Sequence, residues 1–125
     1  MESRHKVLVV DDDPAVLELY RDLLAQLPSR PEIFTTTSGA RALAMLKSEG
    51  FRLLLCDLKM PKVDGMAFFR ELSAKMPHLV RRLIFVTGDV AGTEAERFLD
   101  ESGCRWLAKP FRLRDLVKTA RELLN

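Results

Sequence analysis

The sequence predicts a single α/β domain built on an open parallel sheet. Five times along its 125 residues, a short apolar run is followed by a longer helical segment. The apolar runs are continuous, as expected of parallel strands that are buried on both faces. A chain of this length supports one domain, and an apolar fraction of 47% excludes wholesale disorder.

Five short segments are predicted to be the strands. The clearest is Lys6–Val10, a Val-rich run, and the second strand is the weakest. The predicted strands cover residues 6–10, 33–36, 53–56, 83–86 and 105–108. Because helical segments separate them, neighbouring strands are expected to run parallel.

Capping residues and prolines set the predicted helix boundaries. Asp13 can cap the first helix, and the proline after it suits the first helical position. Apolar spacing then continues to Leu27, before Pro28 ends the helix. Pro77 stops the third helix and Gly103 closes the fourth. The predicted helices cover residues 14–27, 38–50, 66–75, 94–102 and 113–124.

Charge and composition exclude several classes of protein. The 20 Lys and Arg residues nearly balance the 18 Asp and Glu residues, which leaves no strong footprint for nucleic acid. No apolar stretch approaches the roughly 20 residues that span a bilayer, and the N-terminus does not read as a secretory signal. We therefore expect a cytoplasmic protein with no direct nucleic-acid or membrane partner. Cys56 and Cys104 are expected to be buried thiols.

Polar residues stand where four of the predicted strands end. Asp11 and Asp12 follow the first strand, Asp57 the third, Thr87 the fourth and Lys109 the fifth. In open parallel sheets, ligands bind outside the carboxyl ends of the strands. Clustered carboxylates raise each other's pKa values unless a cation lies between them, and Mg²⁺ suits such hard oxygen ligands.

These residue types suit phosphoryl transfer. A Lys ammonium offers a point charge, a Thr hydroxyl offers a hydrogen bond, and a carboxylate can be the nucleophile that forms an aspartyl phosphate. Each feature alone is weak, because an acidic run is more often a solvated turn. Their conjunction at the strand ends predicts Mg²⁺-dependent phosphorylation of an Asp.

With these motifs, the chain resembles the receiver domain of two-component response regulators. The resemblance covers nearly the whole chain and rests on four motifs: Val9-Val10-Asp11-Asp12, Asp57-Leu58-Lys59-Met60-Pro61-Lys62-Val63-Asp64-Gly65, Val86-Thr87-Gly88 and Lys109-Pro110-Phe111. It implies a doubly wound, flavodoxin-like (βα)5 fold with a five-stranded parallel sheet. Residues 1–125 would form one receiver domain, with no output domain in this chain.

The resemblance also implies a site and a partner. Asp57 would accept a phosphoryl group from a histidine on a sensor histidine kinase or a histidine phosphotransfer domain. Asp12, Asp57 and the backbone carbonyl of Lys59 would bind Mg²⁺ (or Mn²⁺) directly, and Asp11 would act through water. Such a domain is not an enzyme in the usual sense, since it catalyses only its own phosphorylation and dephosphorylation.

Two further residues complete the implied acceptor site. Thr87 would bond one phosphoryl oxygen and Lys109 would pair with another. The peptide bond between Lys109 and Pro110 would be cis, a minority state for X-Pro bonds in general.

The implied switch joins Thr87 to Trp106. Thr87 would move toward the phosphate and Trp106 would rotate inward, which would alter a surface made by the fourth helix, the fifth strand and the last helix. A downstream protein would bind this surface, and the domain would be a monomer or a phosphorylation-dependent dimer. A free-standing regulator and a receiver excised from a larger or hybrid-kinase protein both stay open.

Lys59 and Asp89 are predicted to set the lifetime of the phosphate. Lys59 lies two residues after Asp57, and Asp89 lies two residues after Thr87. In the receiver family these positions flank the path of the water that attacks the phosphoryl group. A pair of opposite charges there could obstruct that water.

Two other functions fit part of the pattern. A phosphatase of the haloacid-dehalogenase type also uses a nucleophilic Asp and Mg²⁺, but it needs a second Asp where Lys59 stands. A degenerate receiver could serve only as a docking or dimerisation module, although every acceptor residue is present here.

The remaining expectations are structural. Asp64 and Gly65 are expected in a turn, where Gly65 would allow a positive φ. Cys56 should point away from Asp57 into the core, because side chains alternate along a strand. The isolated His5 and His78 are expected to be exposed.

Overall fold

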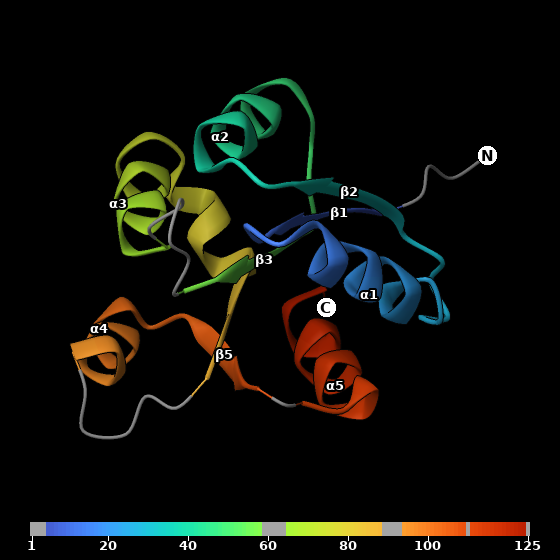
Figure 1. Ribbon diagram of the computed structural model, residues 1–125. Coiled ribbons are helices and arrows are strands. Elements are labelled where there is room, and N and C mark those ends of the chain that lie inside the picture. The colour runs from blue at the N-terminus through green and yellow to red at the C-terminus, as the bar shows by residue number, and fades with distance from the viewer. Residues whose placement is uncertain (1–4, 59–64, 89–93, 110, 125) are drawn as a thin grey trace.

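The computed structural model describes residues 5–58, 65–88, 94–109 and 111–124. Its five strands form one sheet in the order β2-β1-β3-β4-β5, and every neighbouring pair is parallel. Helices cover both faces of this sheet (Figure 1). The predicted doubly wound α/β fold is confirmed.

The strands match the predicted segments closely. They are β1 Lys6–Val10, β2 Glu32–Thr36, β3 Leu53–Asp57, β4 Leu83–Thr87 and β5 Arg105–Ala108. β3 and β4 each extend one residue beyond the predicted end. Their last residues, predicted to follow the strands, are therefore held by the sheet itself.

The helices agree with the prediction at most ends. They are α1 Pro14–Leu24, α2 Gly39–Ser48, α3 Gly65–Lys75, α4 Glu94–Ser102 and α5 Leu113–Leu124. A 3-10 helix that was not predicted, η1 Pro77–Arg82, lies between α3 and β4. Pro77 stops the α-helix as expected, but the chain continues in this tighter winding.

The first helix ends earlier than the sequence predicts. It was expected to reach Leu27, whereas α1 ends at Leu24. Beyond that point the amides of Gln26 and Leu27 bond carbonyls three residues back, at 3.2 and 3.1 Å. Leu27 is apolar because it is buried in the core, although it lies beyond the helix. Its apolar side chain fits the helical spacing, which is why the predicted helix was too long.

Side-chain alternation along the strands divides the core between the two faces of the sheet. Val7 and Val9 of β1 pack with α1 and α5, whereas Leu8 and Val10 pack with α2 and α3. α1 and α5 lie together on one side of the sheet, and α2, α3 and α4 lie on the other (Figure 1). Cys56 belongs to the second side and is buried, as predicted, and Cys104 is also buried.

The predicted Asp13 cap is confirmed, whereas Ser38, predicted as the first residue of the second helix, caps that helix instead. Asp13 Oδ1 accepts a hydrogen bond from the Ala15 amide at 2.9 Å, and Ser38 Oγ accepts one from the Arg41 amide at 3.2 Å. Gly103 follows α4 with a φ of 71°, a conformation that favours glycine.

Gly65 is needed for a different reason from the one predicted. It begins α3, and Gly103 is the described glycine that has a positive φ. A Cβ on Gly65 would lie 2.8 Å from the Leu58 Cα and 2.9 Å from the Leu58 carbonyl oxygen. Glycine is required here because α3 begins directly against the backbone that follows Asp57. Asp64, the other expected turn residue, lies outside the described residues.

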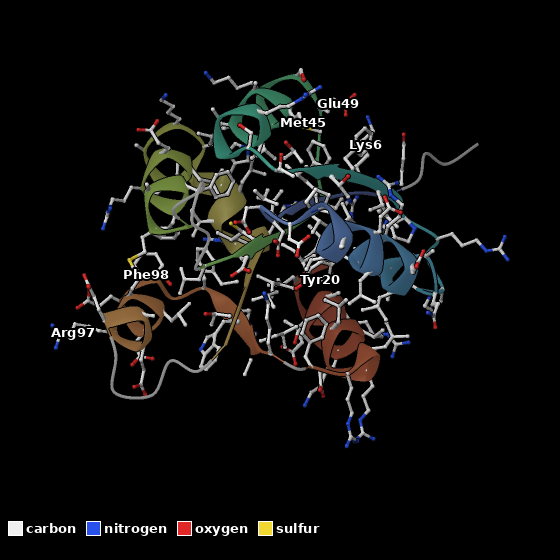
Figure 2. The ribbon with its side chains drawn as sticks, in the orientation of Figure 1. Lys6, Tyr20, Met45, Glu49, Arg97 and Phe98 are labelled. Carbon is white, nitrogen blue, oxygen red and sulfur yellow. The ribbon has the colours of Figure 1, made fainter. Side chains whose placement is uncertain are left out.

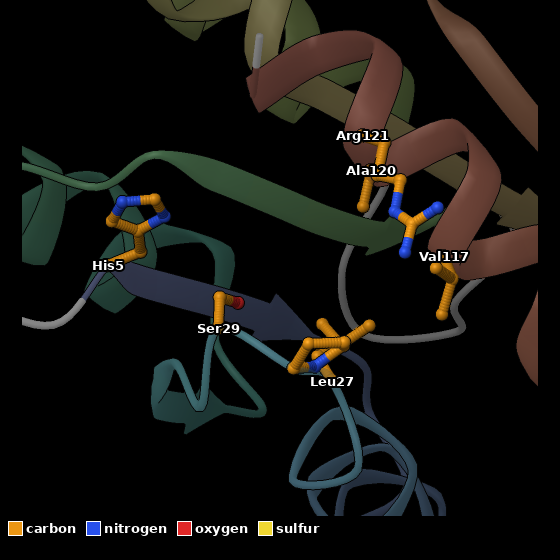
Figure 3. A pocket seen from close by; sticks show the side chains of 7 residues that line it. His5, Leu27, Ser29, Val117, Ala120 and Arg121 are labelled. Carbon is orange, nitrogen blue, oxygen red and sulfur yellow. The ribbon is translucent and has the colours of Figure 1, made fainter.

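The expected exposure of His5 is wrong, whereas that of His78 is confirmed. His5 is half-buried, and its Nδ1 is buried without a hydrogen-bond partner in the described part of the chain. It lines a pocket of about 200 Å³ in which Val117 and Arg121 of α5 lie across from Leu27 (Figure 3). This pocket is at the start of β1, the end of the strand opposite to Asp11.

No helix within the described ranges is long and apolar enough to cross a bilayer.

Candidate functional site

Two buried carboxylates lie at the carboxyl end of the central strands. Asp11 directly follows β1 and Asp57 is the last residue of β3. Because Val10 is in register with Cys56, each carboxylate stands one residue further along its own strand. The exposed fractions are only 2% for Asp11 and 9% for Asp57.

Lys109 directly follows the edge strand β5 and completes the site. Its Nζ lies 2.7 Å from Asp57 Oδ2, and its backbone amide donates to the Thr87 carbonyl at 2.7 Å. The second bond extends the β4–β5 ladder past its last pair, Thr87 and Ala108. Lys109 is therefore fixed by its backbone to β4 and by its ammonium to β3.

The Asp11 carboxyl is only partly satisfied. Its Oδ1 accepts a hydrogen bond from the Asp13 amide at 3.0 Å, whereas its buried Oδ2 has no hydrogen-bond partner among the residues described. Burial raises the pKa of Asp11 to about 6. The bond from Asp13 and the charge of Lys109 oppose this shift, and the negative charge of Asp57 adds to it.

This environment fits a divalent cation. Paired carboxylates and an unpartnered buried oxygen are the hard donors that Mg²⁺ prefers, and Mg²⁺ commonly uses only one or two carboxylates. No group of three His, Cys, Asp or Glu side chains that could hold a metal forms in the described portion of the chain. Asp12 is half-buried and its role as a ligand stays a prediction, as does that of Lys59, which lies outside the described residues.

Thr87 has a buried hydroxyl for which the described residues provide no hydrogen-bond partner. It is the last residue of β4 and is fully buried, and its Oγ1 has no hydrogen-bond partner within the described ranges. A buried unpaired hydroxyl costs about 1–3 kcal/mol, so an added oxygen acceptor nearby would recover that free energy.

Trp106 lies on the surface of the edge strand β5. Its exposed fraction is 38%, and it is in register with the fully buried Phe85 of β4. Its role as a switch residue stays a prediction. Asp89 and Pro110 lie outside the described residues, so the predicted charge pair and the cis peptide bond do too.

Sequence reasoning missed one residue beside the site, Tyr20. In the sequence it is one of the residues at apolar spacing in the predicted first helix. In the structure it is buried, and its ring stacks on that of Phe111 with the centroids 5.9 Å apart. A tyrosine at an apolar helical position was the only signal, and it does not identify a partner so distant in sequence.

The sequence matches the response regulator receiver domain over residues 7–121. The chain belongs to this family. The receiver domain is 32% identical over 113 residues to the two-component response regulator ORR21 of Oryza sativa, covering 89% of this chain and 16% of that protein. It is 33% identical over 120 residues to the response regulator MprA of Mycobacterium ulcerans, covering 96% of this chain and 50% of that protein. The receiver domain thus spans at most about half the length of these relatives.

Solved structures agree with the family. The chemotaxis protein CheY4 of Vibrio cholerae superposes with a TM-score of 0.83 at 25% identity, covering 98% of this chain and all of that one. A CheY-like receiver domain protein of Methanospirillum hungatei superposes with a TM-score of 0.82 at 29% identity, covering 98% and 94%. The receiver domain therefore shares its whole fold with these proteins.

Proposed function

We propose that this receiver domain accepts a phosphoryl group on Asp57 from a phosphohistidine of a partner protein. The observation that carries the proposal is the buried Asp57 carboxylate, held 2.7 Å from the Lys109 ammonium and beside the second acid Asp11. The partner would be a sensor histidine kinase or a histidine phosphotransfer domain, as expected for a member of this family.

The chemistry balances without any other reactant. An oxygen of the Asp57 carboxylate attacks phosphorus, and the phosphorus–nitrogen bond of the donor breaks. The bonding electrons stay on the imidazole nitrogen, which leaves with the partner, and the product is an acyl phosphate. Lys109, already beside Asp57, would offset the negative charge on the phosphoryl oxygens.

Asp12, Asp57 and the backbone carbonyl of Lys59 would bind Mg²⁺ or Mn²⁺ directly, with Asp11 acting through water. When bound, the ion would neutralise charge shared between the carboxylates and the phosphoryl oxygens. The raised pKa of Asp11 supports this assignment, because burial, and then the negative charge of Asp57, disfavour its ionised form when no cation is bound.

Phosphorylation would become a signal through Thr87. Its unpartnered Oγ1 would donate to a phosphoryl oxygen, and the movement would let Trp106 turn inward from the surface. The surface of α4, β5 and α5 would then bind a downstream protein. Lys59 and Asp89 would control how quickly water removes the phosphoryl group.

The decisive experiment is intact-protein mass spectrometry after incubation with acetyl phosphate and Mg²⁺. Wild type should gain the mass of one phosphoryl group, and Asp57→Asn and a sample with excess chelator should not. An equal gain in Asp57→Asn would contradict the proposal. Steady hydrolysis of a phosphate ester would favour the phosphatase alternative, and full biological function of Asp57→Asn would favour a docking module.

A further inference from the structure

The two residues of a stacked aromatic pair come from α1 and from the connection that carries Lys109. Tyr20 lies between α1 and α5 (Figure 2), and its ring and that of Phe111 are 5.9 Å apart at an interplanar angle of 19°. Tyr20 is only 5% exposed, whereas Phe111 is half-buried against the same core cluster. Phe111 lies two residues after Lys109, so the stack fixes the chain just beyond the ammonium-bearing residue.

The same pair shares a groove with Lys109. Burial and then the charges of Asp11 and Asp57 raise the pKa of Tyr20. Tyr20, Phe111 and Lys109 all line one groove of about 480 Å³. It is lined by Val16, Leu19, Tyr20, Leu23, Lys109 and Phe111.

We propose that the Tyr20–Phe111 stack is a positioning device that holds Lys109 Nζ at the phosphoryl site of Asp57. Tyr20 and Phe111 act through Lys109 and touch no reacting atom, so both are positioning residues. The inference rests on the proposed function, because it assigns a role in the same phosphoryl transfer.

Lys109 needs such support because little else confines its side chain. The side chain is 37% exposed on a flexible four-carbon stem, and among the described residues its ammonium forms an ion pair with Asp57 Oδ2. When Asp57 carries a phosphoryl group, that contact must be exchanged for one with a phosphoryl oxygen. A fixed backbone on both sides of Lys109, through Thr87 before it and the stack after it, keeps the ammonium within reach during the exchange.

The test compares variants that remove or keep the stacked rings. Phe111→Leu and Tyr20→Leu stay apolar but remove a ring, whereas Phe111→Tyr and Tyr20→Phe keep both rings. Phe34→Leu is the matched control. It removes a ring from another aromatic pair, Phe34 and Phe51 at 5.3 Å, which packs on the opposite face of the sheet.

The first readout is the rate of Asp57 phosphorylation by acetyl phosphate at saturating Mg²⁺. We expect Phe111→Leu and Tyr20→Leu to be about five- to tenfold slower, and the ring-keeping variants and Phe34→Leu to stay within about twofold of wild type. In a Lys109→Ala background, Phe111→Leu should cause no further slowing, because the residue through which it acts is gone. Equal slowing in both backgrounds, or wild-type rates in both Leu variants, would overturn the proposal.

The second readout needs no phosphorylation. The ¹³C NMR signal of the Lys109 ε-methylene group should move in Phe111→Leu toward its position in Asp57→Asn, and should stay in place in Phe34→Leu. If wild type cannot be phosphorylated, the proposed function fails, yet a shifted signal still supports the positioning role. An unmoved signal in Phe111→Leu overturns it, whatever the kinetics of wild type.

Discussion

At Asp11, burial and a neighbouring negative charge act on the same carboxyl. Its pKa is about 6 in the folded protein, against the ordinary value of 3.8 expected in the unfolded chain. Between these pH values the folded protein holds a proton that the unfolded chain releases. The free energy of unfolding should therefore fall as pH rises from about 4 to about 6.

Asp11→Asn should remove that pH dependence. In metal-free buffer with chelator, urea unfolding of wild type at pH 4 to 7 should show the loss, and Asp11→Asn should show a flatter profile and greater stability at pH 7. The amide keeps an oxygen that can accept the Asp13 hydrogen bond. Asp100→Asn, at an exposed position on α4, is the control. Parallel profiles for wild type and Asp11→Asn would contradict the expected role of Asp11.

Gly65 is a second residue whose replacement should change stability, because it lies too close to the Leu58 backbone for a Cβ. Gly65→Ala would place a Cβ 2.8 Å from the Leu58 Cα, and backbone on both sides leaves no flexible side chain to move away. We expect a net loss of about 1–3 kcal/mol in the free energy of unfolding, despite the better helix propensity of Ala. Gly50→Ala, where a Cβ meets nothing within 4 Å, is the matched control and should change stability little. Equal urea midpoints for both variants would refute the close-approach argument.

At the scale of elements, the start of α1 depends on one side chain. Asp13 Oδ1 satisfies the Ala15 amide at 2.9 Å, and Pro14 removes one more donor from the first turn. Asp13→Ala should lower the free energy of unfolding by about 1 kcal/mol, whereas Asp13→Asn keeps a capping oxygen and should cost less. Chemical denaturation measures both. An Asn variant as unstable as Ala would mean that Asp13 contributes through its charge instead.

Local patterns predicted most elements because strands and helices are encoded over a few neighbouring residues. The strand segments, the Asp13 cap and the Gly103 terminus followed from such signals. The failures involve contacts between distant segments. Leu27 is buried after the helix has ended, and Gly65 is fixed by the backbone of Leu58, not by its own φ.

The candidate site was predictable for a related reason. Asp11, Asp57, Thr87 and Lys109 each stand at the carboxyl end of a parallel strand or directly after it. The order of strands therefore brings Asp11, Asp57 and Lys109 together. The Tyr20–Phe111 stack was not predictable, because it joins two elements whose relative packing depends on the whole core. The structure places Asp11, Asp57, Thr87 and Lys109, but their roles stay predictions, as do those of Asp12, Lys59, Asp89 and Trp106.

At the scale of the whole molecule, the buried hydroxyl of Thr87 links the site to the edge of the sheet. Its Oγ1 has no partner in the part of the chain that the structure describes, and its backbone carbonyl holds the Lys109 amide beside β5. Thr87→Val keeps the branched shape and removes the unpaired hydroxyl. The variant without phosphate should therefore be more stable than wild type by about 1 kcal/mol in urea unfolding.

The same variant should lose the response of the surface. Trp106 is the only Trp in the chain, so its fluorescence reports on β5 alone. Beryllium fluoride with Mg²⁺, as a phosphoryl mimic, should change the fluorescence of wild type in a saturable way and leave Asp57→Asn unchanged. Thr87→Val should still bind the mimic, detected by ¹⁹F NMR, while its fluorescence change is reduced several-fold because the hydroxyl proposed to bond the phosphoryl oxygens is gone. A full fluorescence response in Thr87→Val would show that the signal reaches Trp106 by another route, such as through Lys109 and its own strand.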